Sequence, residues 1–201
     1  MRECLIVGRP NSGKTMFTLN FAAYLGNKTI DILFKTYDGL LTSRHFTIDD
    51  AKRELCDTSP HKTRLPQSIE LKMPQGKTAA HFKLTDTCGV AEKIYKEETI
   101  RKGMAQTLSL IRCADFIIHL LDLTELTVEY LKNPANIDHE IYNYGMVRHN
   151  YIMLLNKIDL AATREPVSRA AEAFPQVVIL PISARYSQGF KEVKNYVARN
   201  I

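Results

Sequence analysis

The sequence lacks the features that define several classes of protein. Its four cysteines are far apart and form no C-x-x-C pair, which favours a reduced cytoplasmic protein over a disulfide-stabilised one. The longest apolar runs, such as residues 116–121, are far shorter than a membrane span. The first predicted strand begins almost at Met1 and leaves no room for a signal peptide. We therefore expect a soluble, cytoplasmic protein with no transmembrane segment.

A dense run of basic residues is also missing. The chain has 27 lysines and arginines against 22 aspartates and glutamates, and the positive residues are scattered. This distribution permits weak attraction to RNA or to an acidic surface without demonstrating either, and we expect no DNA binding. With 201 residues, 45% of them hydrophobic, the chain is long enough for one domain and slightly short for two. We expect a single domain over residues 1–201.

Residues 8–15 read G-R-P-N-S-G-K-T and fit the phosphate-binding pattern G-x-x-x-x-G-K-[ST]. Four fixed positions can match by chance, but this segment lies between an apolar strand (residues 1–7) and a helical pattern (residues 16–25), as the pattern requires. In such a loop, backbone N–H groups surround the β-phosphate of a nucleotide, and the helix points its positive end at the same charge. The residues expected to contact the nucleotide here are Gly8, Asn11, Ser12, Gly13, Lys14, Thr15 and Met16.

Two side chains carry the chemistry of this loop. The ammonium group of Lys14 is expected to reach the β- and γ-phosphates, and the hydroxyl of Thr15 to bind Mg²⁺. Gly8 and Gly13 allow turns that a Cβ would forbid and let the backbone approach the phosphates closely. The loop therefore predicts a Mg²⁺-dependent nucleotide site.

Strands alternate with helices through much of the chain. Residues 69–73 and 80–84 alternate apolar and polar side chains around a turn, which predicts an antiparallel pair. Buried strands are predicted at 116–121, 151–155 and 177–180, and helices at 100–111, 134–144, 167–174 and 190–197. This order predicts a three-layer α/β/α fold with a mostly parallel sheet and one antiparallel edge strand. A ligand should lie beyond the carboxyl ends of the strands, where the motifs fall.

An unusually long segment, residues 27–62, separates the first helix from the antiparallel pair. Within it, residues 29–34 predict a short strand, residues 38–39 a turn, and residues 47–56 a short helix that opens with a capping pattern. The segment could bind a partner, form a lid over the nucleotide or be a plain surface elaboration. The sequence does not decide among these three.

The run Asp86-Thr87-Cys88-Gly89 directly follows a predicted strand. A carboxylate at that position can hold Mg²⁺ through water, and the N–H of Gly89 can bind a γ-phosphate. Loss of that phosphate would release the segment, so two conformations would follow the nucleotide state. D-x-x-G alone is a weak pattern, and its position after the phosphate loop and the strand pair gives it weight.

A second polar run, Asn156-Lys157-Ile158-Asp159, follows another buried strand. The carboxylate of Asp159 can accept hydrogen bonds from N1–H and the N2 amine of guanine, a donor pair that adenine lacks. Asn156 and Lys157 would brace the loop and cover the base. Residues Ser183, Ala184 and Arg185, after the next strand, would add a backbone N–H for the guanine oxygen. The alternative is an ordinary polar turn, in which case the chain would be an ATP-using enzyme such as a small kinase.

With these four elements in order, the chain resembles the G domain of P-loop GTPases, and more narrowly the TrmE-Era-EngA-like group (Era, EngA and MnmE). The group's G-x-P-N-x-G-K-[ST] and D-T-x-G plus an apolar residue are similar to G-R-P-N-S-G-K-T and D-T-C-G-V here, and residues 100–122 also resemble its second helix and following strand. The resemblance covers nearly the full length. It implies a GTP-operated switch that hydrolyses GTP with Mg²⁺ and often acts on ribosomes, RNA or membrane transport.

One departure concerns catalysis. Val90 stands where Ras-like members have a glutamine that orients water, so hydrolysis needs another source of activation. In relatives with this apolar replacement, an asparagine in the phosphate loop helps to bind K⁺, and Asn11 has the matching position. Its alternative role is a structural cap of the loop. The catalytic assignments are Lys14, Asn11 and the N–H of Gly89.

A second departure concerns the switch threonine that would bind Mg²⁺ in the GTP state. Thr63 is the best candidate, because it precedes the strand pair as the family's threonine does, and Thr58 and Thr47 are alternatives. Thr15, Thr63 and Asp86 would then hold the metal. The resemblance implies slow hydrolysis that needs K⁺, dimerisation through the switch face, or a protein, ribosome or RNA effector. The rival interpretation is a guanine-nucleotide-dependent binding module that does not hydrolyse GTP.

Overall fold

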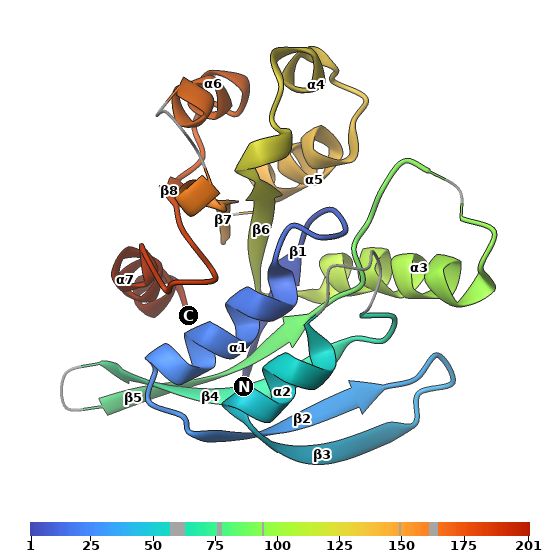
Figure 1. Cartoon of the computed structure of the whole chain (residues 1–201), viewed down its shortest axis with the longest axis vertical. Helices are drawn as coiled ribbons and strands as arrows, with labels where there is room; N and C mark the ends of the chain where they lie inside the picture. Colours follow the sequence, from blue (N-terminus) through green and yellow to red (C-terminus); the bar gives the residue numbers. More distant parts are fainter. Residues whose placement is uncertain (57–62, 76–77, 94, 149, 161–164) are drawn as a thin grey trace.

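The computed structural model describes residues 1–56, 63–75, 78–93, 95–148, 150–160 and 165–201. They form one eight-stranded sheet with helices packed on both faces (Figure 1). The strands are β1 Arg2–Val7, β2 Thr29–Lys35, β3 Leu41–Thr47, β4 Gln67–Gln75, β5 Thr78–Asp86, β6 Phe116–Asp122, β7 Tyr151–Asn156 and β8 Ile179–Pro181. The α-helices are α1 Lys14–Tyr24, α2 Ile48–Leu55, α3 Glu98–Cys113, α4 Val128–Lys132, α5 Ile137–Met146, α6 Glu165–Ala173 and α7 Phe190–Asn200. None of these described helices is long and apolar enough to cross a membrane.

The sheet has the strand order β3-β2-β4-β5-β1-β6-β7-β8. Strands β5, β1, β6, β7 and β8 pair in parallel, and helices make most of the crossover connections that parallel pairing requires. The pairs β4–β5, β2–β4 and β2–β3 are antiparallel. The predicted α/β fold, with a mostly parallel sheet and an antiparallel edge, is confirmed.

Several elements differ from the sequence-based prediction. Strand β3 was not predicted, because only Phe46 among its residues is buried and the alternation of a half-buried strand is missing. Helix α5 begins after Asn136, whose side chain accepts the N–H of His139, rather than at Asn133-Pro134. Strand β8 is shorter than the predicted 177–180 and lies slightly later in the chain.

Two apolar cores lie on opposite faces of the sheet. Residues of α1, α2 and α7 pack on one face, and residues of α3, α4, α5 and α6 pack on the other. Strand β1 shows why the central strands read as unbroken apolar runs. Cys4 and Ile6 face the first core, while Leu5 and Val7 face the second. The three layers of the predicted fold are therefore present.

The register of the parallel strands aligns their carboxyl ends. Ile6 of β1 lies opposite Asp86 of β5, and Asp122 of β6 lies opposite Asn156 of β7. The loop after β1 therefore starts beside Asp86. The polar ends of β5, β6 and β7 meet at one edge of the sheet beside the end of β1, where ligands of open α/β sheets bind.

A buried polar network supports this edge. His119 in β6 is fully buried, and its two ring nitrogens hydrogen-bond with Tyr151 at 2.8 Å and with Asp138 at 2.9 Å. The hydroxyl of Tyr130 donates to the other oxygen of Asp138 at 2.5 Å, and the guanidinium carbon of Arg9 lies 4.9 Å from the Tyr130 ring centre. Burial raises the pKa of Asp138, but these hydrogen bonds outweigh it and leave that pKa below its ordinary value. The network ties the loop after β1 to β6, α5 and β7.

Replacing Asp138 by alanine removes the acceptor that His119 and Tyr130 share. Because these partners would stay buried, we expect the free energy of unfolding to fall by about 3 kcal/mol. A matched control is Asp31→Ala, whose carboxylate also bonds a histidine at 2.8 Å but is 74% exposed. That change should stay within about 0.5 kcal/mol. Urea unfolding followed by circular dichroism compares the two, and equal losses would contradict a stabilising role for the network.

Candidate functional site

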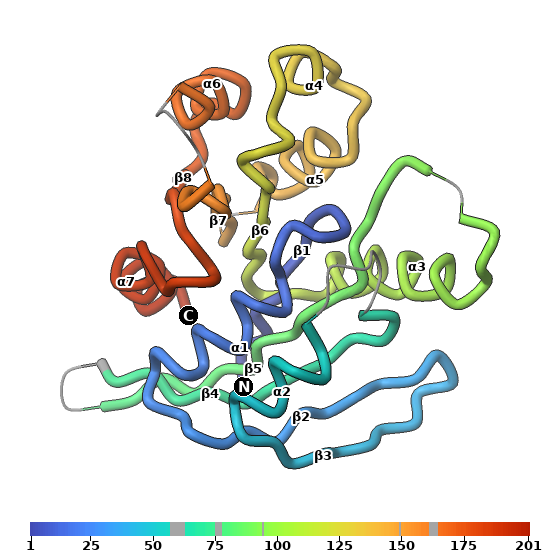
Figure 2. The backbone as a smooth tube through the Cα atoms, viewed as in Figure 1, coloured from blue at the N-terminus to red at the C-terminus, as the bar shows by residue number. Residues whose placement is uncertain are grey.

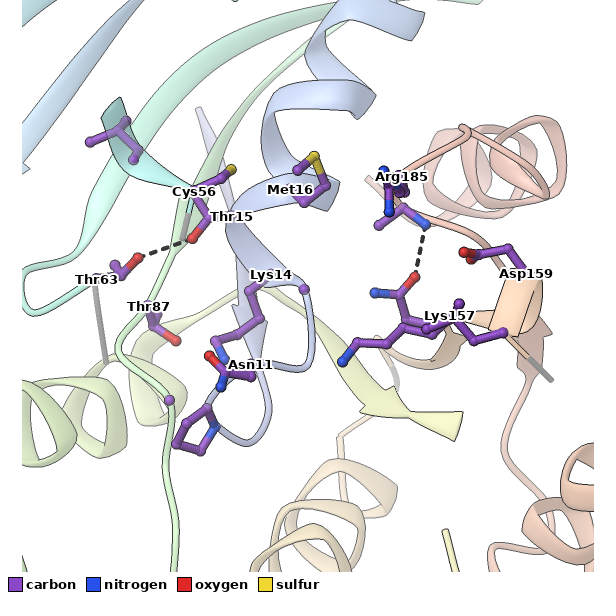
Figure 3. A pocket seen from close by; sticks show the side chains of 17 residues that line it. Asn11, Lys14, Thr15, Met16, Cys56, Thr63, Thr87, Lys157, Asp159 and Arg185 are labelled. Carbon is purple, nitrogen blue, oxygen red and sulfur yellow. Dashed lines mark hydrogen bonds between the residues drawn. The ribbon is translucent and has the colours of Figure 1, made fainter. Parts of the chain in front are cut away.

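A pocket of about 510 Å³ lies at the carboxyl edge of the sheet (Figure 3). Twelve of the residues predicted to form a site line it: Asn11, Gly13, Lys14, Thr15, Met16, Thr63, Gly89, Asn156, Lys157, Asp159, Ala184 and Arg185. Four others are not among the lining residues: Gly8, Ser12, Asp86 and Ser183. The structure therefore brings together segments from the two ends of the chain.

The loop between β1 and α1 has the backbone conformation of a phosphate cradle. Gly8, Asn11 and Gly13 have φ angles of 144°, 61° and 94°. A Cβ at Gly13 would overlap the carboxamide nitrogen of Asn156, so glycine is required here for close approach as well as for φ. Helix α1 begins at Lys14, so its unpaired N–H groups and positive end face the pocket.

Lys14 is buried and folds back over its own loop. Its ammonium group donates to the carbonyl oxygens of Gly8 at 3.1 Å and Arg9 at 2.6 Å. Burial lowers its pKa below the ordinary value, because the charged form loses water, and the nearby carboxylate of Asp86 partly opposes this. The loop carbonyls thus hold a buried cation that a phosphate oxygen would satisfy better.

Three oxygen-bearing side chains meet next to this cation. The hydroxyl of Thr15 donates to Asp86 at 2.6 Å. It also lies 3.0 Å from the hydroxyl of Thr63 (Figure 3). Burial raises the pKa of Asp86 to about 6, against the lowering effects of the Thr15 hydrogen bond and the Lys14 charge. The second oxygen of Asp86 is buried with no hydrogen-bond partner among the described residues. An orphaned carboxylate oxygen beside two hydroxyls is suited to a hard cation such as Mg²⁺.

Of the alternative threonines, Thr47 caps α2 through the N–H of Asp50, and Thr58 lies outside the described residues. The described residues contain no cluster of three His, Cys, Asp or Glu side chains that could hold a metal by themselves. A Mg²⁺ ion here would therefore also need phosphate oxygens, which is the usual way this ion binds beside a nucleotide.

The segment after β5 packs tightly on the phosphate loop. A Cβ at Gly89 would lie 2.5 Å from the backbone nitrogen of Pro10, so this position needs glycine. The N–H of Val90 donates to the carbonyl of Gly8 at 3.2 Å, and its side chain is 1% exposed within the second core. Val90 therefore faces away from the pocket and cannot orient water there.

Asn156 links the two ends of the pocket. Its side-chain nitrogen donates to the carbonyl of Ser12 at 2.7 Å, and its side-chain oxygen accepts the N–H of Ala184 at 2.8 Å. Lys157 has a φ of 71°, and its ammonium group forms an ion pair with Asp122. Asp159 is exposed and lies across the pocket from Lys14, on the same side as Arg185 (Figure 3).

Sequence reasoning missed several residues of this site. Asn20 in α1 donates to the carbonyl of Ala184 at 2.7 Å, and Asp122 pairs with Lys157. Asp122 carried a usable signal, because it is a carboxylate at the end of a wholly buried strand. Leu55 and Cys56, at the end of α2, also line the pocket, but nothing in their local sequence pattern indicates it.

One protein-family model and several solved structures are similar to this chain. Residues 3–157 match the family model described as 50S ribosome-binding GTPase. No curated protein matches the chain. Among solved structures, Era from Aquifex aeolicus bound to GDP·AlF₄⁻ is similar over 100% of this chain, with 21% identity and a TM-score of 0.70. Era in complex with MgGDPNP and 16S ribosomal RNA nucleotides is similar over 99% of it, with 20% identity and a TM-score of 0.68.

The cytosolic domain of FeoB from L. pneumophila is a more distant neighbour. It is similar over 98% of this chain and 69% of its own length, with 16% identity and a TM-score of 0.59. The two Era chains are longer, and this chain spans 57% and 56% of their lengths. At these identities the structural neighbours show the fold, and the family model covers most of the chain. The chain therefore belongs to the 50S ribosome-binding GTPase family and has the fold of an Era-like G domain.

Proposed function

We propose that this protein binds GTP with Mg²⁺, hydrolyses it slowly to GDP and phosphate, and acts as a nucleotide-dependent switch. The observation that carries the proposal is one pocket lined by Lys14 and Thr15 at one end and by Asp159 at the other, with Asn156 joining the two. A triphosphate tail and a purine base fit such a pocket end to end. Membership in a GTPase family supports the same conclusion.

Guanine selection rests on Asp159. Its exposed carboxylate is free to accept N1–H and the N2 amine, while the loop that carries it is fixed by the N–H of Ile158, which donates to the carbonyl of Ile182 at 3.2 Å. The N–H of Arg185 would serve the guanine oxygen, because the N–H of Ala184 already donates to Asn156 at 2.8 Å. Adenine would leave the carboxylate unpaired, which disfavours ATP.

Thr15, Thr63 and Asp86 would hold Mg²⁺ together with phosphate oxygens. The ion, when bound, neutralises charge on the β- and γ-phosphates. Lys14 exchanges its loop carbonyls for the same phosphates, and the N–H of Gly89 can bind the γ-phosphate. Water then attacks the γ-phosphorus in line, the bond to the bridging oxygen of GDP breaks, and the proton leaves with the inorganic phosphate. Loss of the contact at Gly89 would let its segment change conformation.

The buried Val90 leaves this site without a water-orienting side chain at that position, which supports slow turnover unless another charge assists. Asn11 lines the pocket beside Lys14. There its carboxamide oxygen would hold K⁺ next to the β- and γ-phosphates. An effector or a second copy docking on the switch face would serve the same purpose.

One Era structure contains ribosomal RNA, which supports a ribosome or RNA effector here. The four cysteines form no disulfide in the described residues, which supports a cytoplasmic location.

Asp159→Asn tests the guanine contact directly. The variant exchanges one acceptor for a donor facing the base, so GTP and GDP affinity should fall about 10- to 100-fold. Asp49→Asn is the matched control, because that side chain is 87% exposed on α2, and its affinities should not change. Fluorescence titration with labelled GDP measures both. Retained affinity in Asp159→Asn would remove the guanine assignment.

Potassium dependence tests the role of Asn11. If K⁺ supplies the missing charge, single-turnover GTP hydrolysis should be about tenfold or more faster in KCl than in NaCl, and Asn11→Ala should abolish the difference. Equal rates in the two salts would rule out the ion. Failure to convert bound GTP in either salt would instead favour a binding module that needs no turnover.

A further inference from the structure

The long segment of residues 27–62 has no role in the function proposed so far. Its described part forms the hairpin β2–β3 and helix α2, which are drawn in blue and teal in Figure 2. The end of α2 reaches the pocket through Leu55 and Cys56. In the turn of the hairpin, Tyr37 contacts two other segments of the chain.

The hydroxyl of Tyr37 bridges two segments that border the pocket. It lies 3.2 Å from the carbonyl oxygen of Arg64 and 2.8 Å from that of Thr99. Arg64 directly follows Thr63, the proposed Mg²⁺ ligand. Thr99 lies in the first turn of α3, directly after the loop that begins at Asp86. A single phenol therefore contacts both parts of the chain that would respond to the γ-phosphate.

Arg64 is held from other sides as well. Its guanidinium group pairs with Glu97 at 3.1 Å and lies 3.3 Å from the hydroxyl oxygen of Thr99. A Cβ at Gly103 of α3 would lie 2.5 Å from the carbonyl oxygen of Arg64, so the helix backbone packs directly against this carbonyl. We call Tyr37, Arg64, Glu97, Thr99 and Gly103 the hairpin clasp.

We propose that the hairpin clasp positions Thr63 for the Mg²⁺·GTP state, with Tyr37 as a positioning residue that acts through the Arg64 carbonyl. The inference rests on the proposed function of the same pocket. Thr63 has only one peptide bond between it and the clasped residue, and its hydroxyl already lies 3.0 Å from that of Thr15. Fixing Arg64 therefore restricts where Thr63 can place its oxygen. Through Tyr37, the hairpin also links the segment that carries Thr63 to the start of α3. These two segments would therefore move together.

The expected effect is specific and modest. Thr63 would bind the metal only when the γ-phosphate is present, so weakening the clasp should affect Mg²⁺·GTP and leave Mg²⁺·GDP unchanged. Tyr37 is 39% exposed, and water can replace part of its hydrogen bonding. We therefore expect Tyr37→Phe to raise the Mg²⁺ concentration needed for half-maximal GTP binding about threefold, at the low end of what one hydrogen bond contributes.

Hydrogen exchange tests the clasp without a nucleotide. In the nucleotide-free Tyr37→Phe protein, the backbone amides of residues 63–65 should exchange faster than in the unmodified protein. Tyr144→Phe is the matched control, because its hydroxyl donates no hydrogen bond to any residue in the described ranges and its ring lies on the outer side of α5. Unchanged exchange at residues 63–65 in Tyr37→Phe would show that no clasp exists.

A double-mutant cycle tests the route through Thr63. If Tyr37 acts by placing the Thr63 hydroxyl, the Tyr37→Phe shift in Mg²⁺ dependence for GTP should disappear in a Thr63→Val background. Full additivity, or an equal shift for GDP, would overturn the positioning role. Failure of the unmodified protein to bind guanine nucleotides would overturn the proposed function instead, and the exchange experiment would still decide whether the clasp is present.

Discussion

The bridge made by Asn156 is the interaction on which the rest of the site depends. One buried carboxamide donates to Ser12 in the phosphate loop and accepts from Ala184 in the last loop, so the two ends of the pocket keep a fixed separation. Gly13 is glycine partly because this carboxamide lies against it. Removing it would leave a buried carbonyl and a buried N–H unpaired, and the loops would be free to separate.

The parallel strands make this bridge possible. Because their carboxyl ends align, the loops after β1, β5, β7 and β8 converge at one edge of the sheet. The buried network of Arg9, Tyr130, Asp138 and His119 anchors the phosphate loop from the side that faces away from the pocket. The loop is therefore held by the core and by Asn156 before any ligand arrives, which lowers the ordering cost of binding.

Much of the fold and site could be predicted from the sequence, because the motifs are local and the strands that carry them are apolar on both faces. Strand β3 could not, since its exposed residues show no pattern of burial. The placement of Thr63 beside Thr15 and the contacts of Tyr37 depend on how the long segment folds back over α1 and α3, which no local pattern encodes. The burial of Val90 likewise follows from packing against the second core, although its identity already excluded a glutamine-like role.

The central claim is that one pocket holds a guanine base at Asp159 and a phosphate tail at the loop after β1. Equilibrium titration of the unmodified protein with GDP and with ADP, each with Mg²⁺, tests it most directly, because the two ligands differ only in the base. The account predicts that GDP binds and that ADP binds about 100-fold or more weakly, the cost of a mismatched base against a fixed carboxylate. Equal affinity for the two, or binding of neither, would contradict it.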